Sequence, residues 1–490
     1  MDSGALADQD DVRMRALHVL VASLLLGPAS LPAVAAEPMR APTPVKRSRV
    51  IDIPFSQFKL TNGLTVIFHE DHTQPLVVTN INVQVGSRDE PKKRTGFAHL
   101  FEHLMFMGTE RVPEKMFDTW MEQEGGSNNA WTSNDRTDYF DVGPSHILPL
   151  LLWMEADRVG SLGPQMTLDK LDAQRDVVKN ERRQTTENEP YGRAELLLPE
   201  LLFPEGHPYH HPVIGSHEDL TAATVADVRG FFAQHYIPQN FSLVVAGDFE
   251  PAKVKPLVEK YFGSLLRGPE PAPRPSAEPP VLAADKRATL EDNVTLPKLT
   301  IAWPSPAHLT AGDAELDLLA QVLSAGKGSR LYKSLVYEKQ LAQSVHAYQS
   351  SMALGSYFAI DVILRPGVSF ETVEKAIEEE LAEVRGKPVA VEELTRAKNA
   401  FEASFVQRLQ SLANRASMLN GYFAEKGDPG FIAGDLKRYQ DATPDLLLSF
   451  ARSTLLTTGR VLLRIKPAGQ PEPVDSPKDA PKSQPGSAAK

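Results

Sequence analysis

The chain has 490 residues, of which 42% are hydrophobic and 23% charged, and its formal net charge is −11. This length and composition indicate a globular protein of roughly two to four domains. The negative charge argues against nucleic acid and anionic membranes as partners, and the absence of cysteine excludes thiol catalysis, thiolate metal sites and disulfides.

The N-terminus has the layout of a secretory signal. Two arginines precede the apolar run Ala16–Leu26, and small residues up to Ala36 resemble a signal-peptidase site. The run is too short for a transmembrane helix, which needs about 20 residues. The sequence predicts a signal peptide over 1–36, a spacer over 37–52, and a periplasmic or secreted protein. A membrane tether is the alternative, and Met14 is an alternative start.

The first folded domain is expected over residues 53–266, and it begins with strands. The segments Phe58–Phe68 and Leu76–Val85 have the apolar pattern of strands, and a polar turn over His69–Gln74 separates them. The sequence predicts further strands over Thr137–Val142 and Phe241–Gly247, and helices over His146–Arg158, Leu168–Thr186 and Ala252–Phe262.

A helical segment after the second strand contains the motif H-x-x-E-H, formed by His99, Glu102 and His103. Positions i, i+3 and i+4 share one face of a helix, so both imidazoles and the carboxylate project the same way. The surrounding residues are strongly apolar, and a buried polar group without a partner costs roughly 1–3 kcal/mol. One Zn²⁺ would satisfy both rings, and the glutamate could then activate a metal-bound water.

The alternative is that this short motif arose by chance and forms a solvated helix face. The flanking residues favour a buried helix, expected over Gly96–Met107. Thr95 is expected to cap its N-terminus, and Gly108 is expected to follow its C-terminus.

A proline-rich linker is expected over residues 267–295, because 267–280 alone contain six prolines. Beyond it the strand and helix pattern repeats over 296–466, and a tail over 467–490 is expected to be disordered. The fold class is therefore predicted as α+β, with two homologous domains, each a mostly antiparallel sheet with helices packed on one face. The expected elements of the second domain are Leu299–Trp303, Ala311–Leu323, Ser356–Leu364, Val368–Val384, Val391–Ala424 and Gly459–Ile465.

The motif helix, the block G-G-S-N-N-A-W-T at 125–132 and the helix Gln174–Arg183 resemble the pitrilysin-like zinc peptidases. These H-x-x-E-H enzymes (inverzincins) include insulin-degrading enzyme and the mitochondrial processing peptidase. The resemblance implies one zinc ion per chain, held by both motif histidines and by Glu181 on a second helix, with Glu102 as general base. By spacing alone, the third ligand has rivals in Glu155, Glu187 and Glu189.

The resemblance implies two further roles. Gln174 stands where relatives often carry a second glutamate, and its amide is expected to orient a ligand by hydrogen bonding. Asn129, Ala130 and Thr132 match a strand whose edge pairs with extended substrate, so that backbone hydrogen bonds hold the peptide. An internal structural strand is the alternative for this segment.

One departure from the family concerns the second domain. Related active sites also use an arginine and a tyrosine on L-R-x-x-x-x-L-x-Y, which bind substrate and stabilise the oxyanion. Val336 and Gln343 stand at these positions here, and losing oxyanion donors costs on the order of 10²–10³ in rate. A heterodimer in which a homologous subunit supplies the missing pair is therefore expected. A homodimer, or a local substitute such as Arg193 or Arg330, is the alternative.

The predicted function is that of a secreted zinc endopeptidase subunit acting on peptides or unfolded polypeptides. A non-catalytic scaffold and a dedicated precursor-processing peptidase are the alternatives. A second metal site is not expected among the histidines of residues 206–217, because this stretch has the composition of a loop. These histidines are His207, His210, His211 and His217.

Overall fold

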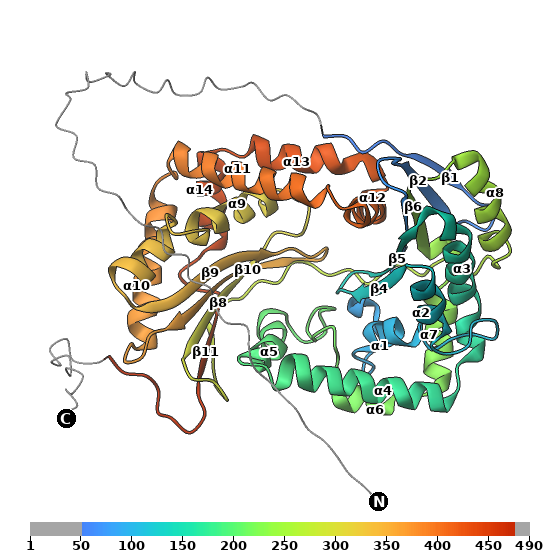
Figure 1. The fold of residues 1–490 in the computed structure, drawn as a ribbon. Coiled ribbons are helices and arrows are strands. Elements are labelled where there is room, and N and C mark those ends of the chain that lie inside the picture. Colours follow the sequence, from blue (N-terminus) through green and yellow to red (C-terminus); the bar gives the residue numbers. More distant parts are fainter. Residues whose placement is uncertain (1–50, 476–490) are drawn as a thin grey trace, which may run out of the picture. The chain divides into compact units, whose positions relative to one another are not determined.

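The computed structural model describes residues 51–475, which fold around two β-sheets (Figure 1). The predicted signal peptide, nearly all of the spacer and residues 476–490 of the predicted tail lie outside the described residues. Within 51–475, none of the helices combines the length and the apolar character that a membrane crossing requires.

The first sheet has six strands in the order β1-β2-β6-β3-β5-β4. Neighbouring strands are antiparallel except β2 and β6, which are parallel. Valine, isoleucine and leucine fill the central strands, which are buried along nearly their whole length. The strands are β1 Ser56–Lys59, β2 Thr65–Glu70, β3 Leu76–Val83, β4 Ser127–Thr132, β5 Thr137–Pro144 and β6 Phe241–Gly247.

The second sheet repeats this plan with five strands in the order β7-β11-β8-β10-β9. Its one parallel pair is β7 with β11, which corresponds in position to β2 with β6. The predicted α+β class, with two related and mostly antiparallel sheets, is confirmed. The strands are β7 Lys286–Asp292, β8 Lys298–Ser305, β9 Ala342–Ser350, β10 Ser356–Leu364 and β11 Val461–Pro467.

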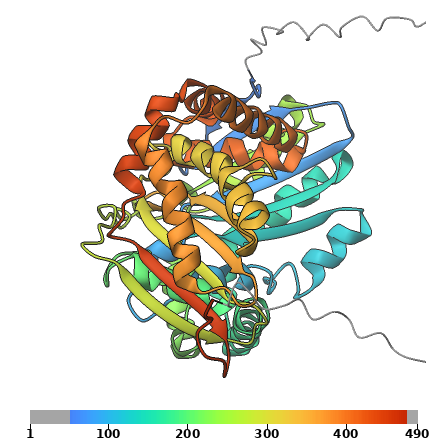
Figure 2. The same cartoon turned by 90° about the vertical axis from the view of Figure 1, so that its left-hand side faces the viewer.

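Most helices of each half pack against one face of their own sheet, as expected from the sequence. Figure 2 shows several helices of the second half, coloured yellow to red, in front of its strands. The helices of the first half are α1 Phe97–Leu104, α2 Met116–Gln123, α3 Leu148–Gln165, α4 Leu168–Arg182, α5 Gly192–Leu202, α6 His217–Ala222, α7 Val225–His235 and α8 Pro251–Phe262. Those of the second half are α9 Asp313–Ser324, α10 Phe370–Gly386, α11 Val391–Arg408, α12 Leu412–Lys426, α13 Ile432–Asp441 and α14 Pro444–Thr454.

The two halves also exchange one helix each, which the sequence did not predict. Helix α12 of the second half covers the other face of the first sheet, where Leu419 packs with Val78 and Val244. Helix α5 of the first half covers the other face of the second sheet, where Leu198 packs with Leu463. Each sheet is therefore buried on both faces.

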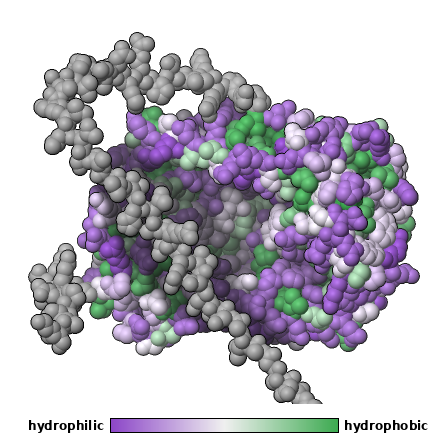
Figure 3. Space-filling model, viewed as in Figure 1, coloured by the Kyte–Doolittle hydropathy of each residue, from purple (hydrophilic) through white to green (hydrophobic). Residues whose placement is uncertain are grey.

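Apolar side chains lie mainly in these internal layers. On the face shown in Figure 3, hydrophilic residues predominate and hydrophobic ones form small, separate groups. Two of the most exposed apolar side chains in the described part of the chain are Leu266, 89% exposed, and Val281, 91% exposed. Both lie in the stretch between α8 and β7, which has no regular structure and matches the start of the predicted linker.

Several predicted elements have shifted ends, and three differ more deeply from the structure. Phe58–Phe68 is a hairpin of β1 and β2 rather than one strand, because the chain turns at Asn62 and Gly63, where Gly63 has φ +100°. The expected helix Val391–Ala424 is broken into α11 and α12, and Ser411 caps the second. Strand β7 lies inside the expected linker 267–295.

Candidate metal centre

The motif helix α1 lies in the core of the first half, with Leu100, Phe101 and Leu104 fully buried. Its N-terminal boundary residue is Gly96, with φ +88°, and the prediction that Thr95 caps the helix is wrong. Both the amide and the hydroxyl of Thr95 donate to Asp219 instead.

A buried carboxylate, which sequence reasoning missed, caps α1. Glu90 Oε2 accepts from the Gly96 amide at 2.9 Å, and Oε1 accepts from the Ala98 amide at 2.8 Å. Burial raises the pKa of Glu90, and the two amide donors oppose that shift.

The helix ends at Leu104, so Gly108 lies farther beyond it than predicted. Gly108 instead forms a close turn, in which an added Cβ would meet the Glu114 amide nitrogen at 2.5 Å.

Helices α1 and α4 lie against each other (Figure 1) and bring together His99, His103 and Glu181. The two Nε2 atoms are 3.3 Å apart, and Glu181 Oε2 lies 3.0 Å from His103 Nε2. Glu181 Oε1 lies 3.7 Å from His99 Nε2. One donor atom from each residue lies within 4.8 Å of the other two. Two imidazoles and a carboxylate with a solvent-facing side match the donor set of a catalytic zinc site.

The protonation states at this cluster also suit metal binding. Burial, followed by the charge of His103, lowers the pKa of His99 to about 4, against the influence of Glu181. The hydrogen bond from His103 lowers the pKa of Glu181. A neutral imidazole and an ionised carboxylate are the forms that coordinate a metal ion. In addition, His99 Nδ1 is buried without a hydrogen-bond partner.

Glu102, on the same helix as the two histidines, makes a hydrogen bond to a strand of the first sheet. Its Oε2 accepts a hydrogen bond from Thr132 Oγ1 at 2.6 Å. The hydroxyl oxygen of Thr137 lies 3.4 Å from that of Thr132. Because the Thr137 hydroxyl donates to the Val85 carbonyl, the Thr132 hydroxyl donates its own proton to Glu102. Burial raises the pKa of Glu102, and this hydrogen bond opposes the shift. The Thr132 side chain therefore contacts the expected base, a role that sequence reasoning did not assign.

The segment expected to bind substrate forms β4, which lies at the edge of the first sheet. Among the described residues, β4 pairs only with β5. One of the residues expected to contact substrate is Ala130, whose amide donates a hydrogen bond to Asn129 Oδ1 at 2.8 Å. The open edge is the feature that β-strand addition of a peptide requires.

The rival carboxylates are engaged elsewhere or exposed. Glu155 is buried in an ion pair with Arg158, and Glu187 binds Arg182 and His217. Glu189 is exposed.

Gln174 contacts the end of the motif segment rather than a ligand. Its Nε2 donates to the sulfur of Met107 at 2.7 Å. Its expected role in orienting a ligand remains a prediction.

The four histidines of residues 206–217 form no metal cluster. The first three lie in a loop and bond through Nδ1 to the backbone, and the last begins α6. Within the described part of the chain, the only group of three or more close metal-ligating side chains is the one on α1 and α4.

In the second half, Val336 lies partly buried against the core, and Gln343 is exposed on β9. The suggested substitutes are already engaged. Arg330 makes two hydrogen bonds to Glu393, and Arg193 donates to the Glu291 carbonyl.

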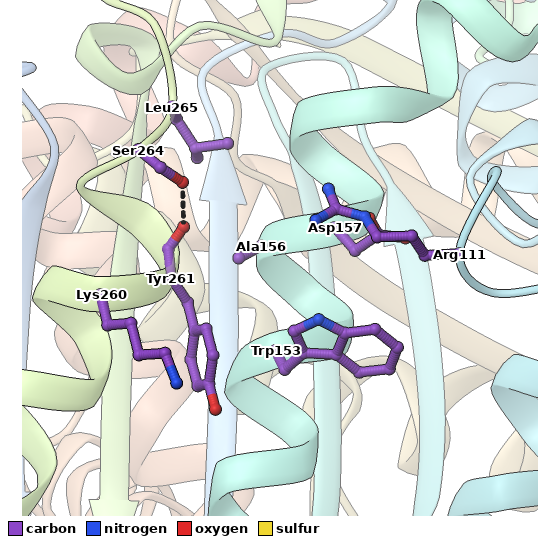
Figure 4. Close-up of a pocket in the computed structure, with 8 residues that line it drawn as sticks. All are labelled: Arg111, Trp153, Ala156, Asp157, Lys260, Tyr261, Ser264 and Leu265. Atoms are coloured by element: carbon purple, nitrogen blue, oxygen red, sulfur yellow. Dashed lines mark hydrogen bonds and ion pairs between the residues drawn. The ribbon is translucent and has the colours of Figure 1, made fainter.

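A separate pocket of about 540 Å³ lies between α3 and α8 (Figure 4). Trp153 and Tyr261 project into it, while the buried carboxylate of Asp157 is occupied by Arg111 and Thr109. None of the clustered metal-ligating residues lines this pocket.

Two family models match the chain. Residues 65–205 match "Insulinase (Peptidase family M16)", and residues 222–401 match "Peptidase M16 inactive domain". The chain is 30% identical to the zinc protease PqqE of Helicobacter pylori over 393 residues, covering 80% of this chain and 87% of the relative. It is 26% identical to a probable mitochondrial-processing peptidase subunit beta of Schizosaccharomyces pombe, covering 60% of this chain and 65% of the relative.

Solved structures of related proteins have a similar fold. A crystal structure of a protease from Helicobacter pylori superposes with a TM-score of 0.79 at 27% identity, covering 85% of this chain and 100% of the other. An M16 inactive-domain structure from Pseudomonas fluorescens shares the fold, with a TM-score of 0.76 at 20% identity, covering 86% of this chain and 100% of the other.

Proposed function

Because this chain belongs to the insulinase family of peptidases, family M16, we propose that it is the zinc-bearing subunit of an endopeptidase. Its substrates are peptides or unfolded polypeptides. The observation that carries the proposal is the convergence of His99, His103 and Glu181 within 4.8 Å, with Glu102 on the same helix as both histidines. The zinc-protease names of several relatives support the choice of metal.

In this proposal His99, His103 and Glu181 hold one zinc ion, which polarises the scissile carbonyl and makes water acidic when bound. Glu102 takes the proton of the attacking water and passes it to the leaving amine. Thr132 holds the Glu102 carboxylate in place through its hydrogen bond to Oε2. The open edge of β4 aligns the peptide by backbone hydrogen bonds.

A homologous partner completes the site in this proposal. Val336 is apolar and Gln343 is neutral, and Arg330, one of the suggested substitutes, is already bound to Glu393. The partner would supply the arginine and tyrosine of the family motif. The predicted signal peptide supports a site of action in the periplasm or outside the cell, and the proposed partner would act in the same compartment.

The test uses the mature chain, alone and co-expressed with a neighbouring homologue that carries L-R-x-x-x-x-L-x-Y but no H-x-x-E-H. Cleavage of a quenched peptide library is measured together with zinc content. Replacing Glu102 with Gln should leave zinc bound and lower kcat/KM about 10²- to 10⁴-fold, because a general base contributes that much. Glu189→Gln is the matched control, since Glu189 is exposed, and it should change nothing.

Three outcomes would contradict parts of the proposal. Full activity of Glu102→Gln with zinc still bound removes the base from the mechanism. Stoichiometric zinc without cleavage by either the chain or the complex favours the scaffold alternative, which the changed residues at 336 and 343 support. Cleavage of a single precursor, but not of the library, favours a dedicated processing peptidase.

A further inference from the structure

The turn between β4 and β5, residues Ser133–Arg136, is where segments distant in the sequence meet. The carboxylate of Asp135 lies at its centre. Its Oδ1 accepts from Arg88 Nη1 at 2.9 Å and from the Tyr209 hydroxyl at 2.5 Å. Its Oδ2 accepts from the Ala353 amide at 3.1 Å. Three separate segments therefore bond to one side chain.

Two hydrogen bonds connect the first half to the turn between β9 and β10. The Ala353 amide binds Asp135 directly, and the Leu354 amide donates to the Tyr209 hydroxyl at 3.1 Å. Tyr209 is only 1% exposed as a residue, and its partly buried hydroxyl both donates to Asp135 and accepts from Leu354. Hydrogen bonds to a charged group are among the stronger ones.

The linker and α12 hold the same turn from other sides. Arg274, in the proline-rich stretch, donates to the Asp135 carbonyl at 2.5 Å and makes two hydrogen bonds to Asp89. Arg136 lies 3.6 Å from Glu425 of α12. The turn also packs closely on Gly86, where an added Cβ would come within 2.4 Å of the Asn134 carbonyl oxygen.

Two short routes lead from this turn to the candidate active site. Along the strand, β4 ends at Thr132, which holds Glu102. On the other side, Arg88 and Asp89 immediately precede Glu90, whose carboxylate caps the motif helix. The turn is therefore tied both to the strand that orients the base and to the segment that seats α1.

We infer that Asp135 and Tyr209 are positioning residues for the reaction, which couple the β9–β10 turn of the second half to the placement of Thr132 and Glu102. The inference rests on the proposed function, because it concerns the geometry of that base. It goes beyond the metal site by giving the second half a role in activity within this chain. Both residues act through the turn and touch no reacting atom.

Two substitutions test this coupling with little change of volume. Tyr209→Phe deletes only the hydroxyl that joins Asp135 to Leu354. Asp135→Asn replaces an acceptor oxygen with a donor, so the side chain can no longer accept all three hydrogen bonds. The matched control is Tyr439→Phe, which deletes a tyrosine–aspartate hydrogen bond of 2.7 Å to Asp317 in the second half, outside the turn.

The test variants should lower kcat about 10- to 100-fold, because a small misplacement of a catalytic group has that effect. KM for a short peptide should change by less than about threefold. Zinc content should be unchanged. In a readout that needs no activity, amide hydrogen exchange over residues 127–137 should become faster in both variants. Tyr439→Phe should leave both kcat and exchange in that segment unchanged.

The inference is overturned if both variants keep wild-type kcat and exchange over 127–137. It is equally overturned if Tyr439→Phe has the same effects, since the loss would then reflect general destabilisation. If the wild-type complex cleaves no peptide, the proposed function fails, and the exchange experiment alone decides whether the turn couples the halves. Equal effects of the single and double variants would support the inference, because the two residues would then act as one unit.

Discussion

The second sheet repeats the order of five of the six strands in the first sheet, with the same single parallel pair, yet within residues 51–475 only the first half gathers metal-ligating side chains. The difference lies in equivalent helices. Helix α1 stands between β3 and β4, and α9 stands between β8 and β9. On α9 the polar residues are satisfied within the protein, because Asp313 binds Arg438 and Tyr439 donates to Asp317. On α1 the imidazole nitrogens face one another and Glu181.

This comparison shows that the shared scaffold does not itself set the chemistry. In the first half, the two histidines of α1 face each other and Glu181 of α4 reaches both of them. In the second half, α11 supplies Glu393 to Arg330 instead.

Removing one of the three proposed zinc ligands should have the largest effect, because the first half would then bind no more zinc than the second. Replacing Glu181 with Ala leaves two nitrogen ligands, which is fewer than catalytic zinc sites use. Zinc content by elemental analysis and peptide cleavage should both fall to background. Asp317→Asn on the equivalent helix α9 is the control and should retain both. Full zinc occupancy in the Glu181 variant would contradict the ligand assignment.

Removing the hydroxyl that holds the expected base should have the next largest effect. Thr132→Val deletes a hydrogen bond to a carboxylate, which is worth roughly 1.5–3 kcal/mol. The expected loss in kcat/KM is therefore about tenfold or more, with zinc content unchanged. Thr132→Ser should restore most of the activity, because the hydroxyl returns. A serine variant as slow as the valine variant would assign the effect to packing.

The third test compares the caps of α1 and α9 by the loss of melting temperature when each cap is removed. Glu90→Ala leaves two buried amides of α1 without acceptors, at a cost of about 1–3 kcal/mol for each orphaned group. Helix α9 is capped more locally, by Glu315, which accepts from the Gly312 amide. Glu315→Ala should therefore lower the melting temperature less than Glu90→Ala. The reverse order would show that the carboxylate of Glu90 is not what seats α1.

The smallest effect is the pH dependence that Asp317, in the second half, contributes to stability. Burial raises the pKa of Asp317 from 3.8 to about 6. The folded state then binds more protons than the unfolded state between these values, so stability falls as pH rises through this window. Asp317→Asn cannot ionise, and it should raise the melting temperature at pH 7.5 while changing little near pH 4. An equal shift at both pH values would contradict the stated cause.

Local patterns allowed much of the fold and the candidate site to be predicted from the sequence. Strands β6 and β10 have the predicted bounds, because their apolar runs end at clear turn signals. The pairing of His99 with His103 follows from helical periodicity alone. Glu181 could be chosen over Glu155 and Glu187 only through the family resemblance, since helix spacing does not show which segments meet.

The features that escaped prediction depend on contacts between distant residues. Glu90 caps α1 from outside the helix, so the local signal at Thr95 was misleading. Thr132 contacts Glu102 because β4 crosses beside α1, which no spacing shows. The exchange of α5 and α12 between the halves could not be predicted either. Each is an amphipathic helix, and its sequence does not indicate which of the two sheets its apolar face covers.

The exchanged helices mean that the two halves cannot be separated without damage. A gene cut in the proline-rich stretch would yield a first fragment whose sheet lacks the cover of Leu419 and a second whose sheet lacks the cover of Leu198. Each fragment would carry a bare apolar layer, the kind of surface that drives aggregation. The duplicated plan is thus one cooperative body, and the boundary between its repeats is not a boundary for folding.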